Sequence, residues 1–128
     1  MLATFYVAVG GGAGAILRFW TTNLAVHFLG RGFPWGVLLV NVLGSLLIGM
    51  AWVIIVERAV VDAQLRNLLM VGFLGGLTTF STFSMDSLSM IEGGAYGKAM
   101  IYVLASVVLC LIATWIGLKF GRSLGWQA

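Results

Sequence analysis

The sequence GGLTTFSTFS, residues 75–84, lies within an apolar stretch that runs from about residue 68 to residue 91. It combines a glycine pair with five Ser and Thr residues. Glycine pairs weaken a helix, and Ser and Thr side chains can bond to carbonyl groups of their own helix. We therefore predict a helix that is broken within this string, and the rest of the fold must accommodate that break.

The composition indicates what surrounds this helix. Of the 128 residues, 61% are hydrophobic and 9% are charged. A soluble domain has about 25% charged and roughly 45–50% apolar residues, because its surface must face water. This chain has too few charges to coat a water-soluble globule, so we expect lipid around it. A transmembrane helix needs about 20 apolar residues, which leaves room for at most about five spans.

Charge and cysteine content exclude other classes of protein. The net charge of +3 is spread along the chain, whereas a nucleic-acid-binding domain has its basic residues clustered on one face. The single cysteine, Cys110, cannot form an intramolecular disulfide. The sequence contains no nucleotide-binding motif and no catalytic constellation, so we predict that the protein is not an enzyme.

Four apolar stretches, separated by short breaks, cover the chain. They run at about residues 2–29, 35–56, 68–91 and 99–120. Helices close their hydrogen bonds within one segment, which makes them the expected form in lipid. The prediction is an all-α membrane protein with four transmembrane helices in a single domain, residues 1–128. Because no Lys or Arg precedes the first stretch, we expect a span there rather than a cleaved signal peptide.

The basic residues near the span ends carry little orientation signal. With four spans, the termini and the loop after the second span share one side, which has four basic residues. The other side has two, or three if Arg18 reaches towards it. Positive residues mark the cytoplasmic side, so this near balance predicts either insertion in both orientations or one orientation with cytoplasmic termini. The residues counted are Arg58, Arg66, Lys119 and Arg122 on the first side, and Arg31 and Lys98 on the second.

Glycines recur every four residues in two of the stretches. Gly10 and Gly14 stand in the first stretch, and Gly72 and Gly76 stand in the third. Small residues at this spacing allow helix backbones to approach closely. The pattern predicts tight helix packing and carries no information about function.

The polar residues inside the spans suggest a site for a small anion. Phe80 and Phe83 are three residues apart on one side of a helix, and Ser81 and Ser84 form an adjacent row. These residues are either core packing with self-bonded hydroxyls or part of a polar path. Asn41 is either a link between helices or a donor in a pore. The fourth stretch has a polar stripe at every fourth residue, namely Tyr102, Ser106, Cys110 and Thr114.

The chemistry of these groups favours an anion over a cation. Hydroxyl and amide hydrogens are donors, and the edge of an aromatic ring is the positive end of its quadrupole. Arg18 is either an anchor that reaches the membrane surface or a cation that attracts anions into a vestibule. Asp86 carries a negative charge, so we do not place it in the path of an anion.

The sequence resembles the Fluc (CrcB) family of fluoride channels. The resemblance covers the whole chain: GAILR at residues 14–18 in the glycine-rich first helix, PWGVLLVN at residues 34–41, and GGLTTFSTFS at residues 75–84. It implies passive export of fluoride from a bacterial cytoplasm across the inner membrane, which reduces fluoride toxicity. It also implies an antiparallel, dual-topology homodimer with two fluoride pores and a structural sodium ion at the centre of its interface.

The resemblance further implies which residues form these sites. The family's sodium ligands are backbone carbonyls at the helix break, which map onto Gly75 and Thr78. Fluoride is strongly hydrated, so a dry pore must replace its water with donors and positive ring edges, and a central cation would offset part of the desolvation cost. The implied pore residues are Asn41, Phe80, Phe83, Ser81, Ser84, Tyr102 and Thr114, with Arg18 in the vestibule and Cys110 where the family often has serine.

Two other functions remain open at this point. A small dual-topology, proton-coupled multidrug transporter would share the four helices and the balanced charge. It would need a carboxylate in the first helix, where this chain has Arg18 and no acidic residue before Glu57. An accessory subunit that packs through its glycines would not need a ten-residue polar break.

Overall fold

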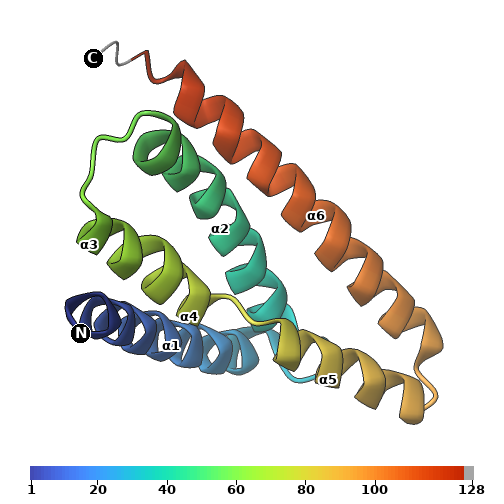
Figure 1. The fold of residues 1–128 in the computed structure, drawn as a ribbon. Coiled ribbons are helices and arrows are strands. Elements are labelled where there is room, and N and C mark those ends of the chain that lie inside the picture. Colours follow the sequence, from blue (N-terminus) through green and yellow to red (C-terminus); the bar gives the residue numbers. More distant parts are fainter. Residues whose placement is uncertain (126–128) are drawn as a thin grey trace.

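The computed structural model describes residues 1–125, which form helices joined by short connections, with no strand in that range (Figure 1). Four helical units are long and apolar enough to cross a membrane. They are Leu2–Leu29, Trp35–Glu57, Ala63–Glu92 and Tyr96–Ser123. The prediction of an all-α, multi-pass membrane protein with four spans is confirmed.

The four spans differ in the helical segments that form them. The first is the single helix α1 (Leu2–Leu29), and the fourth is the single helix α6 (Tyr96–Ser123). The second joins α2 (Trp35–Ala51) to η1 (Trp52–Glu57), a stretch of wider π-helical turns. The third is assembled from four pieces, α3 (Ala63–Arg66), the π-helical η2 (Asn67–Leu74), α4 (Gly75–Leu77) and α5 (Phe80–Glu92).

Two helical segments are longer than their apolar stretches. The third begins at Ala63 rather than near residue 68, because the Asp62 side chain caps it by accepting a 2.8 Å hydrogen bond from the amide of Leu65. The fourth runs over 96–123 rather than 99–120. Within these extensions Lys98 donates to the carbonyl of Gly32, and Arg122 pairs with Glu57. Charged residues mark where a helix leaves the apolar layer, and the helix itself continues past them.

Glycines set the packing of α1 against the third span. α1 packs against η2 and α4 (Figure 1). A Cβ atom added at Gly10 would fall on the carbonyl oxygen of Leu68, and one at Gly14 on that of Phe73. A Cβ at Gly76 would in turn fall on the backbone of Gly11. The tight packing predicted from the glycine spacing is therefore confirmed for this pair.

A second glycine contact joins α2 to α6, which lie side by side in Figure 1. A Cβ added at Gly49 would fall on the carbonyl oxygen of Thr114, and one at Gly117 on that of Leu46. The buried apolar residues are few, because most large side chains face outwards, as expected where lipid is the solvent. Two small clusters form the core, one of Val37, Phe83 and Tyr102 and the other of Val40, Leu74 and Leu77.

Candidate functional site

The third span changes backbone conformation at Thr78 and Thr79. α4 ends at Leu77, both threonines are extended, with φ −83°, ψ 154° and φ −149°, ψ 118°, and α5 begins at Phe80. Helical hydrogen bonds cannot continue through extended residues, so the backbone groups on either side need other partners. Non-helical backbone at membrane depth is tolerated where protein or a cavity satisfies it. We call residues 78 and 79 the extended pair.

Asn41, from the middle of α2, satisfies both backbone groups of Thr79. Its Oδ1 accepts a 2.8 Å hydrogen bond from the amide of Thr79, and its Nδ2 donates a 3.0 Å hydrogen bond to the carbonyl of the same residue. The sequence left two roles open for Asn41, a link between spans and a donor in a pore. These hydrogen bonds form a link between α2 and the third span. One hydrogen of the Nδ2 group remains for another acceptor.

The side chains of the extended pair bond within their own span. Thr79 is the N-cap of α5, since its Oγ1 accepts from the amide of Thr82 at 3.2 Å. The same hydroxyl lies 3.1 Å from Oγ1 of Thr82 and 3.3 Å from Oγ of Ser81. The Thr78 hydroxyl donates to the carbonyl of Leu74 at 2.9 Å. Thr79 is buried, whereas Ser81 and Thr82 are exposed, so this set of bonds extends from the interior to the surface of the chain.

Arg18 brings a full positive charge to the extended pair. Its Nη1 donates a 3.2 Å hydrogen bond from α1 to the carbonyl of Thr78. The side chain is half-buried and lines a cavity of about 720 Å³, together with Thr79, Thr82 and Asp86. Arg18 therefore points into the protein here instead of extending to the membrane surface.

An aromatic group stands directly beyond the extended pair. The ring centroids of Phe80 and Phe83 are 5.4 Å apart, and those of Phe83 and Tyr102 are 5.2 Å apart. Phe33, from the connection before α2, meets the Tyr102 ring edge-on at 5.5 Å. The Tyr102 hydroxyl donates to Oδ2 of Asp86 at 3.3 Å. Phe83 and Tyr102 are buried, whereas Phe80 is 77% exposed and lies at the surface of this group.

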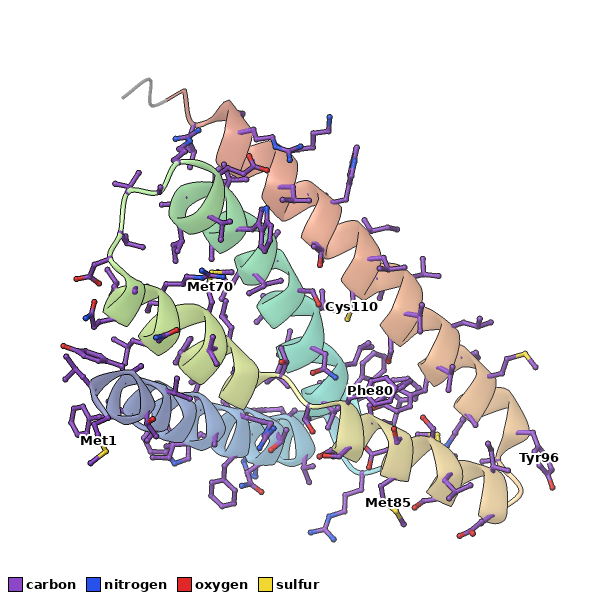
Figure 2. All side chains as sticks on the ribbon, viewed as in Figure 1. Met1, Met70, Phe80, Met85, Tyr96 and Cys110 are labelled. Atoms are coloured by element: carbon purple, nitrogen blue, oxygen red, sulfur yellow. The ribbon has the colours of Figure 1, made fainter. Side chains whose placement is uncertain are left out.

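A second cavity, of about 460 Å³, lies where α2, α4, α5 and α6 converge. Phe80 and Cys110, both labelled in Figure 2, are among its lining residues. Thr79 lines this cavity as well as the larger one that contains Arg18. Thr79 is therefore a wall residue of both cavities, one of which is lined by Arg18 and the other by Phe80 and Phe83.

The cavity of about 460 Å³ brings together part of the predicted site. Five of the predicted residues line it, namely Asn41, Gly75, Thr78, Phe80 and Phe83. Four others, Ser81, Ser84, Tyr102 and Thr114, are not among the residues that line it. Ser84 and Thr114 donate to carbonyls one turn back in their own helices, those of Phe80 and Cys110. Their hydroxyl hydrogens are thus already engaged.

The α6 stripe divides into buried and cavity-lining positions. Tyr102 is fully buried, and Ser106 and Cys110 line the cavity of about 460 Å³. The Ser106 hydroxyl is buried, and within residues 1–125 it has no hydrogen-bond partner. A buried hydroxyl without a partner carries a desolvation cost, so it marks a place where another group can bind.

Sequence reasoning missed two residues of the site. Thr79 was part of the quoted string without a role of its own, although a Thr that precedes a helix by one residue is a common N-cap. Asp86 was set aside because of its charge, yet it lines the larger cavity and accepts from Tyr102. That pair is 16 residues apart, and no local pattern connects them.

Cation ligands at this site would be backbone oxygens. Among residues 1–125, no group of three or more His, Cys, Asp or Glu side chains is placed to hold a metal ion. The amide of Thr79 donates to Asn41, so the Gly75 carbonyl loses the partner it would have in a continuous helix. Gly75 and Thr78 both line the cavity of about 460 Å³. Carbonyl oxygens suit hard cations, so these two positions fit such an ion.

Comparison with known proteins adds a family assignment to this geometry. A relative named fluoride-specific ion channel FluC, from Methylococcus capsulatus (strain ATCC 33009 / NCIMB 11132 / Bath), is 48% identical over 123 residues, which is 96% of this chain. The chain spans only 54% of the length of that relative. Proteins of the same name from Magnetococcus marinus and Coxiella burnetii (strain Dugway 5J108-111) are 43% and 45% identical.

The latter two relatives match nearly end to end. The alignments cover 91% and 92% of this chain, and 95% and 96% of the relatives. The sequence pattern of the family described as "CrcB-like protein, Camphor Resistance (CrcB)" matches residues 5–118. This range covers most of each of the four spans and every residue of the site described above, so the chain belongs to the CrcB-like protein family.

Proposed function

We propose that this chain forms a fluoride-selective channel that exports fluoride passively across a bacterial inner membrane and so lowers fluoride toxicity. The observation that carries the proposal is that Thr79 lines two cavities, one of which is lined by Arg18 and the other by Phe80 and Phe83. The fluoride-specific names of the relatives support the choice of ion. The path is built from neutral donors and ring edges, which suits a small anion.

The larger cavity would act as the vestibule. Arg18 would raise the local concentration of anions there, because a positive charge in a low-dielectric wall attracts them. Asp86 lies in the same cavity, but its carboxylate accepts from Tyr102, which leaves less of its charge to repel an anion. Thr82, with a hydroxyl on α5, lines the vestibule next to Thr79 and offers a donor at its inner end.

The two phenylalanines would select for size. Their rings are tilted by 58° to each other, so they are not stacked face to face, and a small ion could approach a ring edge. Ring edges are weak positive partners that can replace water around fluoride without holding it tightly, as conduction requires. Chloride is larger and would have to separate the rings.

A second copy of the chain would complete the path. Phe80 is 77% exposed and Gly75 is also exposed, although both belong to the site. We propose that an antiparallel partner, inserted in the opposite orientation, covers this face. The near balance of basic residues at the two ends supports insertion in both orientations.

The same dimer would hold a structural sodium ion at the centre of its interface. The carbonyls of Gly75 and Thr78 from both copies would be its ligands, since these positions line the face and the Gly75 carbonyl lacks its helical partner. Thr78 also accepts from Arg18, and a carbonyl oxygen has a second lone pair for a cation. The bound ion would supply a fixed positive charge that lowers the cost of placing fluoride in the membrane interior.

The proposed function is tested by ion efflux from liposomes that contain the purified protein. Fluoride and chloride release are followed with ion-selective electrodes. We expect rapid release of fluoride without comparable release of chloride, and a strong loss of fluoride release in Phe80→Ile and in Phe83→Ile, because an aliphatic side chain has no positive edge. Equal fluxes of the two ions would contradict the proposal.

A matched control for the exposed Phe80 separates the ring effect from a general loss of stability. Phe5 is an exposed phenylalanine near the start of α1, outside both cavities, and Phe5→Ile makes the same chemical change there. We expect this variant to retain the wild-type rate of fluoride release.

A proton-coupled multidrug transporter has little support, because α1 carries Arg18 and contains no acidic residue.

A further inference from the structure

The hydrogen bonds around Thr79 differ from those of a continuous helix in one informative way. In an α-helix, the amide of residue 79 would donate to the carbonyl of residue 75. Here that amide donates to Oδ1 of Asn41 at 2.8 Å, and the carbonyl of Thr79 accepts from Nδ2 of Asn41 at 3.0 Å. A side chain from another span thus takes the place of the Gly75 carbonyl as partner of the Thr79 amide, and the Gly75 carbonyl, at a residue that lines the cavity of about 460 Å³, loses its helical donor.

The approach of α2 to the extended pair makes this exchange possible. Gly44 lies three residues after Asn41, and a Cβ atom added there would fall on Cγ2 of Thr78. The missing side chain at Gly44 therefore lets α2 come close to the extended pair. At this separation the short Asn41 side chain reaches Thr79 directly, and Thr79 itself is buried.

The contact with Thr79 requires an amide side chain at position 41. The extended Thr79 presents one donor and one acceptor to α2, and an amide side chain offers one of each at the same end. A carboxylate would accept from the Thr79 amide but would face the Thr79 carbonyl without a donor. An aliphatic side chain would leave the Thr79 amide without its partner, which favours return of that amide to the Gly75 carbonyl.

We propose that Asn41 is a positioning residue for the cation site: by bonding both backbone groups of Thr79, it keeps the Gly75 carbonyl free to bind sodium. This role rests on the proposed structural sodium. It is distinct from a role of Asn41 in contacting fluoride. It predicts that loss of the Asn41 amide weakens sodium binding even though Asn41 does not touch the ion.

The test measures sodium-dependent thermal stability of the purified full-length protein, without any flux. Unfolding temperatures are recorded as sodium chloride replaces N-methylglucamine chloride at constant ionic strength. Wild type is expected to be stabilised with a definite sodium midpoint, and Asn41→Ala is expected to raise that midpoint about tenfold, as expected for loss of two part-buried hydrogen bonds. Ser45→Ala is the control, because Ser45 lines the same cavity one turn further along α2, and it should keep the wild-type midpoint.

Asn41→Asp provides a second variant, which serves if Asn41→Ala does not fold. It keeps the acceptor for the Thr79 amide and loses the donor to the Thr79 carbonyl, so we expect an intermediate rise in the sodium midpoint. An unchanged midpoint in the Asn41 variants, with altered fluoride selectivity in liposomes, would overturn the positioning role and make Asn41 a pore donor. A wild-type protein that sodium does not stabilise would overturn the sodium site and this role together, while fluoride-selective flux would still stand.

Discussion

The single chain does not explain why Ser106, a buried residue, carries a hydroxyl group. Its hydroxyl is buried on α6 and has no hydrogen-bond partner in residues 1–125. It lines the cavity of about 460 Å³, in line with Cys110 one turn further on. A hydroxyl in this position either destabilises the protein or serves a partner that comes from outside the chain, such as the conducted anion.

Replacement of Ser106 should separate stability from conduction. We expect Ser106→Ala to raise the free energy of unfolding by about 1 kcal/mol, because an unpaired buried hydroxyl is removed. We expect the same variant to release fluoride more slowly from liposomes, because a donor to the anion is lost. Unfolding in mixed micelles and fluoride efflux are the two measurements.

Ser87→Ala is the matched control for this prediction. Ser87 is as buried as Ser106, but its hydroxyl donates to the carbonyl of Phe83 at 2.7 Å. Removal of a satisfied hydroxyl should give no gain in stability. Equal stability changes in the two variants would show that the Ser106 hydroxyl is satisfied in the assembled protein.

At the scale of elements, the extended pair creates two helix ends within the third span. The segment that ends at Leu77 presents carbonyl groups, and the segment that begins at Phe80 presents amide groups. Helix C-termini are partially negative and N-termini partially positive. Two residues thus separate a place that favours cations from one that favours anions, which is the combination that the proposed sodium and fluoride sites require.

The glycine contact between α1 and the third span can be tested with two glycines of the same helix. A Cβ added at Gly14 would fall on the carbonyl oxygen of Phe73, whereas one added at Gly12 has nothing within 4 Å. We expect Gly14→Ala to lower the free energy of unfolding by about 1–3 kcal/mol, because backbones must separate. Gly12→Ala should be neutral or slightly stabilising, since Ala favours helix more than Gly.

The measurement for this pair is reversible unfolding in mixed micelles, followed by circular dichroism. Both substitutions add one methyl group to α1, so a difference between them reports the contact and not the change in helix propensity. If Gly14→Ala were as stable as Gly12→Ala, the close approach of α1 to η2 would be wrong.

At the scale of the whole molecule, the basic residues near the span ends are almost evenly divided between the two sides, so they give little preference for one orientation in the membrane. We expect two added lysines at one end to force a single orientation, because positive residues are retained on the cytoplasmic side. Val60→Lys with Ala63→Lys adds them at the α2–α3 connection, where both positions are exposed. Gly32→Lys with Gly97→Lys adds them at the opposite end, where a Cβ at either position has nothing within 4 Å.

An antiparallel dimer predicts a simple result for these two double variants. Each expressed alone should fail to release fluoride, because only one orientation is present, and co-expression of both should restore release. Fluoride efflux from vesicles of the expressing cells measures this, with membrane content as the control. Full activity of either variant alone would contradict the antiparallel arrangement.

The sequence by itself determined the class of protein and its division into spans. Apolar runs and scarce charge depend only on composition along the chain, and lipid solvation requires each long apolar run to be a helix. Helix ends were less predictable. Asp62 caps a helix that begins inside a charged stretch, and α6 already includes Lys98, whose side chain bonds to the carbonyl of Gly32. Side chains of the site, such as those of Asn41, Arg18 and Tyr102, were identified from the sequence, but their hydrogen-bond partners were not.

Only the tertiary structure decided what those side chains do. Asn41 meets Thr79 across 38 residues, and Arg18 meets the Thr78 carbonyl across 60. Tyr102 bonds to Asp86 on another helix. No periodicity along one helix encodes such contacts, because they depend on how closely two spans approach, and that distance is set by glycines on separate helices. The sequence identified the donors, and the packing of α1 and α2 against the third span determined which backbone groups they hold.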